Sequence, residues 1–168
     1  DLTKHHILDT FGAMVSGSNL PPGKVAIQMA RAYGGERVAT VAGSNVVCGA
    51  IEAAHANGML AHSDETDDSH APSLSHPGCA VIPAALALGE HLGCDGQRFL
   101  RAVTLGYDVG PRMGMALGAN AYQTETHHST HKIAGEFGAA AAAAGVAAFN
   151  ARQMRWVLDY AAQQASGI

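Results

Sequence analysis

Residues 62–78 hold a dense group of ionisable side chains, in the run HSDETDDSHAPSLSHPG. The run contains four carboxylates and three histidines, which are Asp64, Glu65, Asp67, Asp68, His62, His70 and His76. Like charges held this closely make carboxylates harder to ionise, and histidine titrates near neutral pH. Carboxylates and imidazoles together are the usual groups for moving protons on and off carbon or oxygen. The run therefore predicts acid–base chemistry, and the alternative is a solvated acidic loop.

A second group of ionisable residues lies at 127–132 and contains His127, His128, His131 and Lys132. Both groups lie at the edge of an Ala- and Gly-rich segment, and helices built from small residues pack closely. If the groups meet, Asp68 or Glu65 would orient His76 as a general acid or base. His128 and Lys132 would then supply positive charge for a substrate carboxylate.

Two other uses of these residues stay open. Asp and His are ligands for Mg, Mn or Zn, but DETDDSH lacks the HExxH spacing that would make a metal specific, so neither a metal nor an organic cofactor is predicted. The last alternative is a non-catalytic helical interaction domain. Such a domain does not need six histidines in two loops, which makes it the weakest of the three hypotheses.

Length and composition limit the class of protein. The 168 residues suit one domain with a sizeable core. Hydrophobic residues make up 48%, charged residues 14%, and the net charge is −4, which argues against nucleic acid as a partner. No apolar run reaches the length of a membrane span, and no signal peptide is visible. Three cysteines without CxxC spacing, Cys48, Cys79 and Cys94, favour reduced thiols and a cytoplasmic location.

Hydrophobic periodicity predicts an all-α fold, an irregular bundle with Ala/Gly-rich central helices. No convincing strand pair is found, and residues 38–41 are at most extended. Pro111 should kink or break the fifth helix, and residues 118–130 lack periodicity and are predicted as a loop. The predicted helices cover residues 2–15, 22–33, 46–60, 78–92, 97–117 and 132–148, with one more after Asn150.

Several single residues carry structural expectations. Ser44 or Asn45 should cap the third helix, Asp95 the fifth, and Asn150 the last, with Gln153 at the capping-box position. Two groups are expected in the core, His55 and Asn57 as hydrogen-bonded residues, and Trp156, Val157 and Tyr160 as packing residues.

The run AHANGMLAHSDETDDSHAPSLSHPGCAVIPAALALGE resembles the hallmark of the MmgE/PrpD family. Members typically show a helix ending in Ala-His, then Asp-x-Asp-Asp-Thr, then a His-Pro that opens the next helix. LDTFGAMVSGS resembles the family's first helix, and HHSTHKIAGEFGAAAAAAG resembles its second histidine segment. The resemblance therefore covers essentially all 168 residues.

Residue by residue, the resemblance implies that His76 is the catalytic acid or base and that Asp67 and Asp68 are the paired aspartates. His128 matches the second active-site histidine. His131 remains a candidate for that role, because the spacing from His128 to Gly135 is one residue longer than is usual in the family.

Two positions depart from the family pattern. Glu65 stands where many members have aspartate, and Ser69 stands where many have threonine. These departures leave the exact substrate open.

The family includes 2-methylcitrate dehydratase, cis-aconitate decarboxylase and iminodisuccinate epimerase. The resemblance implies a cofactor-independent lyase that acts on a small di- or tricarboxylate, of the 2-methylcitrate dehydratase type found in propionate metabolism, with decarboxylation or epimerisation as alternatives. It also implies a homodimer, and a smaller α/β lid domain later in the chain. Residues 1–168 are similar only to the first part of the helical domain, without the family's active-site lysine. We therefore expect this incomplete domain alone to be inactive.

Overall fold

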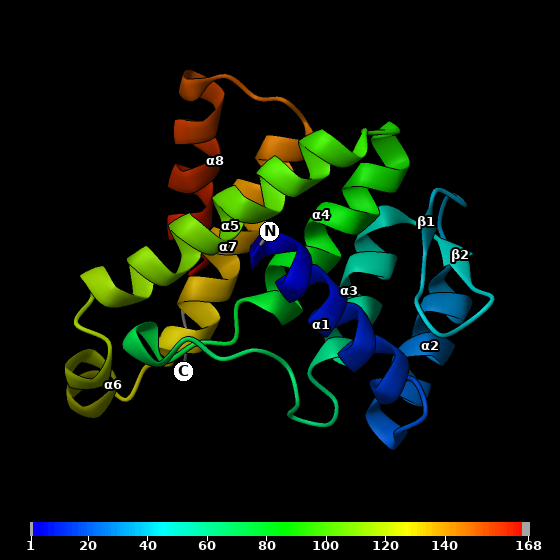
Figure 1. Ribbon diagram of the computed structural model, residues 1–168, viewed down its shortest axis with the longest axis horizontal. Coiled ribbons are helices and arrows are strands. Elements are labelled where there is room, and N and C mark those ends of the chain that lie inside the picture. The colour runs from blue at the N-terminus through cyan, green and yellow to red at the C-terminus, as the bar shows by residue number, and fades with distance from the viewer. Residues whose placement is uncertain (1, 166–168) are drawn as a thin grey trace.

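The computed structural model describes residues 2–165, and helices form nearly all of its regular structure (Figure 1). The all-α prediction is confirmed. The α-helices are α1 (Leu2–Gly17), α2 (Pro21–Tyr33), α3 (Ala50–Ala61), α4 (Gly78–Leu92), α5 (Gly96–Ala116), α6 (Asn120–Thr126), α7 (Thr130–Val146) and α8 (Ala151–Gln164). The remaining elements are strands β1 (Ala39–Thr40) and β2 (Val47–Cys48) and the 3-10 helix η1 (Ala71–Ser73).

Helices α4, α5 and α7 form the centre of the bundle (Figure 1). They approach closely because small residues face one another: a Cβ added at Gly106 of α5 would lie 2.7 Å from the carbonyl oxygen of Gly138 in α7. Val81 and Ile82 of α4 and Val103 of α5 fill the space around this contact and are fully buried. The small Ala and Gly side chains thus allow the helices to pack closely, and dense van der Waals contact stabilises this packing.

Two of the three predicted helix caps form. The Asp95 carboxylate accepts a hydrogen bond from Arg98 N (2.8 Å) at the start of α5. Asn150 and Gln153 form a capping box at the start of α8. Each cap satisfies backbone N–H groups that have no partner inside the helix.

The expectation of no strand pair was wrong, because β1 and β2 form a short antiparallel pair. Since Val47 and Cys48 belong to that pair, α3 begins at Ala50 and is preceded by Gly49, without a cap from Ser44 or Asn45. Asn57 explains how the pair is held. Its buried side chain donates to Thr40 O (2.9 Å) and accepts from Ala42 N (2.8 Å), as expected of a hydrogen-bonded core residue.

Two predicted interruptions take another form. Helix α5 continues past Pro111, where the buried Gly110–Pro111 pair packs against α7 and supports the weakened turn. The segment predicted as a loop contains α6. None of the seven residues of α6 is buried, so no apolar stripe marked this helix in the sequence.

Three residues expected in the core lie at the surface. His55 is exposed, and Trp156 and Tyr160 are 48% and 69% exposed. Helix α8 packs on α7 and buries only Ala161, which leaves its aromatic side chains outside. Within residues 2–165, no helix is both long enough and apolar enough to cross a bilayer.

Candidate active site

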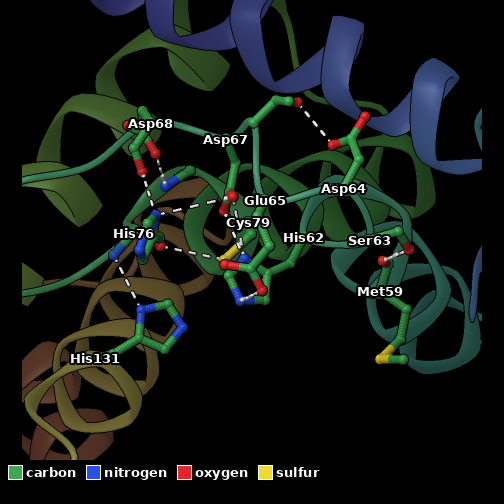
Figure 2. Close-up of polar contacts among 12 residues, drawn as sticks. Met59, His62, Ser63, Asp64, Glu65, Asp67, Asp68, His76, Cys79 and His131 are labelled. Carbon is green, nitrogen blue, oxygen red and sulfur yellow. Dashed lines mark hydrogen bonds and ion pairs between the residues drawn. The ribbon is translucent and has the colours of Figure 1, made fainter.

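The acidic run forms the connection between α3 and α4, and the start of α7 lies against it (Figures 1 and 2). His62 ends α3 and Gly78 begins α4. Two hydrogen bonds join the connection to α7. His76 N donates to His131 Nδ1 (3.0 Å), and Thr130 Oγ1 donates to Leu74 O (3.3 Å). The two histidine-containing segments therefore meet, as the sequence suggested.

His76 is held in a defined tautomer. Its Nδ1 lies 2.9 Å from the backbone carbonyl of Asp68, which can only accept a hydrogen bond (Figure 2). Nδ1 must therefore carry the proton, and in the neutral ring Nε2 keeps its lone pair. The half-buried His76 ring is thus ready to accept a proton at Nε2.

Asp67 supplies a buried negative charge beside this histidine. Its side chain has no exposed surface. His62 Nδ1 lies 3.1 and 3.0 Å from its two oxygens, and His76 Nδ1 lies 3.8 Å from Oδ1. A carboxylate in this position stabilises a positive charge on either imidazole.

His131 is held in the opposite tautomer. Because the backbone N–H of His76 is a donor, His131 Nδ1 must accept, and the ring proton lies on Nε2. Burial lowers the pKa of His131, and the neighbouring rings of His62 and His76 lower it further. His131 is therefore a neutral imidazole that offers one N–H as a hydrogen-bond donor.

The three imidazoles form a compact group, which we call the histidine cluster (His62, His76 and His131). Their ring centroids are 5.2 to 5.4 Å apart. Cys79 lies beneath, with its Sγ donating to His76 O (3.2 Å). Burial and the nearby charge of Asp67 raise the pKa of this thiol, so Cys79 packs as a neutral group and is no nucleophile.

The carboxylate of Asp68 is occupied by structural contacts. It accepts from Tyr107 Oη (2.8 Å) and Gly78 N (2.9 Å), and His6 Nδ1 lies 3.3 Å away. Burial and the charge of Asp68 raise the pKa of Tyr107, which therefore remains a phenol and a donor. These contacts join the loop to α1, α4 and α5. They fix the Asp68 carbonyl that orients His76.

The other predicted site residues lie further out. The Glu65 side chain is 74% exposed, and its Oε1 is 3.6 Å from His62 Nε2. Ser69 is exposed on the loop. Lys132 Nζ lies 3.6 Å from Glu136 Oε2. His128 Nδ1 pairs with Tyr122 Oη of α6 (3.1 Å), so the histidine that contacts His76 is His131.

Three residues of this network were not predicted as site residues. His62 was visible as the Ala-His that ends the third predicted helix, and that motif was the available signal. His6 and Tyr107 belong to α1 and α5, far from the loop in sequence. No local pattern marks such residues, because only the folded chain brings them to Asp68.

A shallow groove of about 710 Å³ runs beside the histidine cluster, between α3, α4 and α7. Its lining is mainly small and apolar, and His131, Lys132 and Cys79 lie at its edge.

A match to the MmgE/PrpD N-terminal domain spans residues 1–168. The chain belongs to the MmgE/PrpD family. The resemblance read from the acidic run is therefore confirmed, and the histidine cluster lies within the part of the chain that carries that resemblance.

Curated relatives that this chain matches include cis-aconitate decarboxylases. The human cis-aconitate decarboxylase is 31% identical over 97% of this chain and 34% of its own length. The cis-aconitate decarboxylase-like protein oryM of Aspergillus oryzae is 28% identical over 98% of this chain and 36% of its own length. An Aspergillus terreus cis-aconitate decarboxylase is 27% identical over 68% of this chain and 24% of its own length. The chain thus spans about a third, or less, of the length of these relatives, and membership supports a lyase.

Proposed function

We propose that this chain forms the helical part of a cofactor-independent lyase that moves a proton next to a carboxylate of a small di- or tricarboxylate. The observation that carries the proposal is the tautomer of His76. Asp68 O lies 2.9 Å from His76 Nδ1 and accepts its proton in a hydrogen bond, which leaves the Nε2 lone pair available as a base. Family membership and the named decarboxylase relatives support the lyase class.

In the proposed reaction, His76 Nε2 removes a proton from the carbon next to a substrate carboxylate. The electron pair of the broken C–H bond forms an enolate-like carbanion. In dehydration, this pair then forms the double bond, while the C–O bond of the hydroxyl on the neighbouring carbon breaks with its electrons going to oxygen. The leaving hydroxyl takes a proton from solvent and departs as water. The imidazolium of His76 is stabilised by the buried Asp67 carboxylate, 3.8 Å from Nδ1.

In the decarboxylation alternative, the same residues act in the reverse order. Carbon dioxide leaves and its bonding electrons remain on carbon, and the imidazolium of His76 then gives its proton to that carbon. The neutral His131 donates its Nε2 proton in a hydrogen bond to the developing negative charge. A neutral donor suits this task, because it stabilises the anion without transferring its proton early.

The proposal extends to the whole protein. Ser69, His128 and Lys132 form the outer contacts to substrate carboxylates, and Glu65, 3.6 Å from His62 Nε2, orients an imidazole of the site. The protein acts as a homodimer in the cytoplasm. The three free thiols fit a reducing compartment. Residues 1–168 alone are expected to be inactive, because the lysine and lid that the family resemblance implies are not in them.

A second candidate function is metal-dependent chemistry at the same place. One observation favours it: His62, Asp67 and His76 place ligand atoms within 4.8 Å of one another. A metal cofactor would make activity sensitive to chelators, whereas the proton-transfer mechanism needs none.

The test measures the activity of the complete protein on 2-methylcitrate, cis-aconitate and iminodisuccinate in separate assays that follow the product of each. His76→Gln should lower kcat by about 10²–10⁴-fold, the usual size of an acid–base contribution. The control is His127→Gln, which changes an exposed histidine outside the histidine cluster. Unchanged kcat in a folded His76→Gln protein would refute the base role, and loss of activity on chelation would favour the metal alternative.

A further inference from the structure

The charged centre of the histidine cluster has the geometry of a transition-metal site. In a tetrahedral zinc site with bonds of about 2.0–2.1 Å, neighbouring ligand atoms are about 3.4 Å apart. His62 Nδ1 lies 3.0 Å from Asp67 Oδ2, and His76 Nδ1 lies 3.8 Å from Asp67 Oδ1. The ligand atoms that the three side chains offer, one from each, all lie within 4.8 Å of one another, so a modest convergence of the side chains would bring them to one ion.

The donor set also selects the type of ion. Two imidazoles and one carboxylate suit Zn²⁺, whereas Mg²⁺ and Ca²⁺ prefer oxygen donors. The carboxylate of Asp67 is fully buried, and its neighbours in the site are imidazoles that can be neutral. A divalent cation would compensate that buried charge more completely than the shared imidazole proton does.

We propose that the atoms His62 Nδ1, Asp67 carboxylate and His76 Nδ1 form an inhibitory Zn²⁺ site. Zn²⁺ binding moves the ring proton of each neutral histidine from Nδ1 to Nε2, and it breaks the hydrogen bond from His76 Nδ1 to Asp68 O. Protons compete with Zn²⁺ for the ligand nitrogens, so the affinity falls as pH falls. The fourth position stays open to water, because His131 Nδ1 is held by His76 N.

The inhibition rests on the proposed function, but the binding does not. With zinc on Nδ1, the His76 ring loses the contact that orients it. Its Nε2 then carries the ring proton and has no lone pair with which to act as a base. Zinc and proton transfer at His76 are therefore mutually exclusive.

The binding experiment is calorimetric titration of the complete protein with Zn²⁺ near neutral pH, with Mg²⁺ as the comparison ion. One Zn²⁺ should bind per chain, and Mg²⁺ should not compete. His62→Gln and Asp67→Asn should each weaken the dissociation constant by more than the roughly 10–100-fold that loss of an outer contact causes. His127→Gln, the matched control, should leave it unchanged. Equal zinc affinity in wild type and both ligand variants would overturn the proposal.

A second measurement uses the wild-type protein and does not depend on the folding of variants. Zinc should shift the imidazole NMR signals of His62 and His76 and leave those of His127 in place. Shifts confined to other histidines would place the ion elsewhere and refute the site. In the activity assay, zinc should inhibit and a chelator should restore the rate. A rate lost on chelation of the untreated enzyme would instead show a metal cofactor, and zinc binding without any measurable lyase activity would refute only the proposed function.

Discussion

The two histidine-containing segments of this protein differ in how firmly the fold holds them. In residues 62–78, His62 and His76 are joined to a buried carboxylate, and the loop is fixed to three helices through Asp68. In residues 127–132, His128 pairs with a tyrosine of the exposed helix α6. One residue of the second segment, His131, belongs to the first by its contacts.

The start of helix α7 explains why His128 and His131 have different partners. Ser129 caps α7 by accepting from Lys132 N, so His128 lies before the helix and His131 lies in its first turn. Helical residues point in fixed directions, and His131 is directed at His76. Both histidines are half-buried, but three positions in sequence separate the acceptor that faces His76 from a histidine that faces Tyr122.

The largest effect should come from replacing His131 by alanine in the complete enzyme, with the replacement of His128 as the comparison. His131→Ala removes a neutral donor beside the proposed base, so kcat should fall by about 10²–10³-fold, as for a lost oxyanion contact. His128→Ala should lower kcat by less than a tenth of that factor, because His128 hydrogen-bonds Tyr122 and not a member of the histidine cluster. Steady-state kinetics of both variants measure the two kcat values. A larger loss of kcat for His128→Ala than for His131→Ala would contradict the assignment of His131 to the site.

A smaller effect, on stability, should follow from adding a methyl group at the start of α4. A Cβ at Gly78 would lie 2.7 Å from Asp68 Oδ1 and 2.9 Å from Tyr107 Oη. Gly78→Ala should therefore lower the free energy of unfolding by about 1–3 kcal/mol, as overpacking does. Denaturant unfolding measures it.

The matched control is Gly96→Ala at the start of α5, where an added Cβ meets nothing within 4 Å. Stability there should stay the same or rise by about 0.4–1 kcal/mol, because alanine restricts the unfolded chain. Equal destabilisation at both positions would mean that the Asp68 network does not hold the loop.

The smallest effect should appear in the pH dependence of stability. The pKa of His131 is lower in the folded protein than its ordinary value of 6.5. Above pH 6.5 the His131 ring is neutral in both the folded and the unfolded chain, so it does not change the free energy of unfolding. As pH falls through 6.5 towards the lowered value, the unfolded chain binds the proton first, so the free energy of unfolding decreases.

His131→Gln removes this proton-binding group and keeps an oxygen that can accept from His76 N. Its stability should therefore decline less steeply than that of the wild type over the same pH range. Thermal unfolding at a series of pH values measures the slope. Parallel curves for the two proteins would show that His131 does not titrate differently on folding.

Sequence reasoning reached the helical class, the close packing of Ala- and Gly-rich helices, two helix caps and the family to which the chain belongs. These features rest on local signals: periodicity, capping residues and a family motif that all lie within short runs. Where a local signal was weak, prediction failed. Three features had no distinctive pattern: the strand pair of two residues each, helix α6, in which no residue is buried, and the surface positions of Trp156 and Tyr160.

The chain alone therefore determined which residue types are available for proton transfer, and where along it they are concentrated. Only the tertiary structure decided which of them touch. His131 instead of His128 meets His76, and Tyr107 and Gly78 anchor Asp68. The tautomers of His76 and His131 were decided in the same way, because each depends on a backbone group that only folding brings within hydrogen-bond distance.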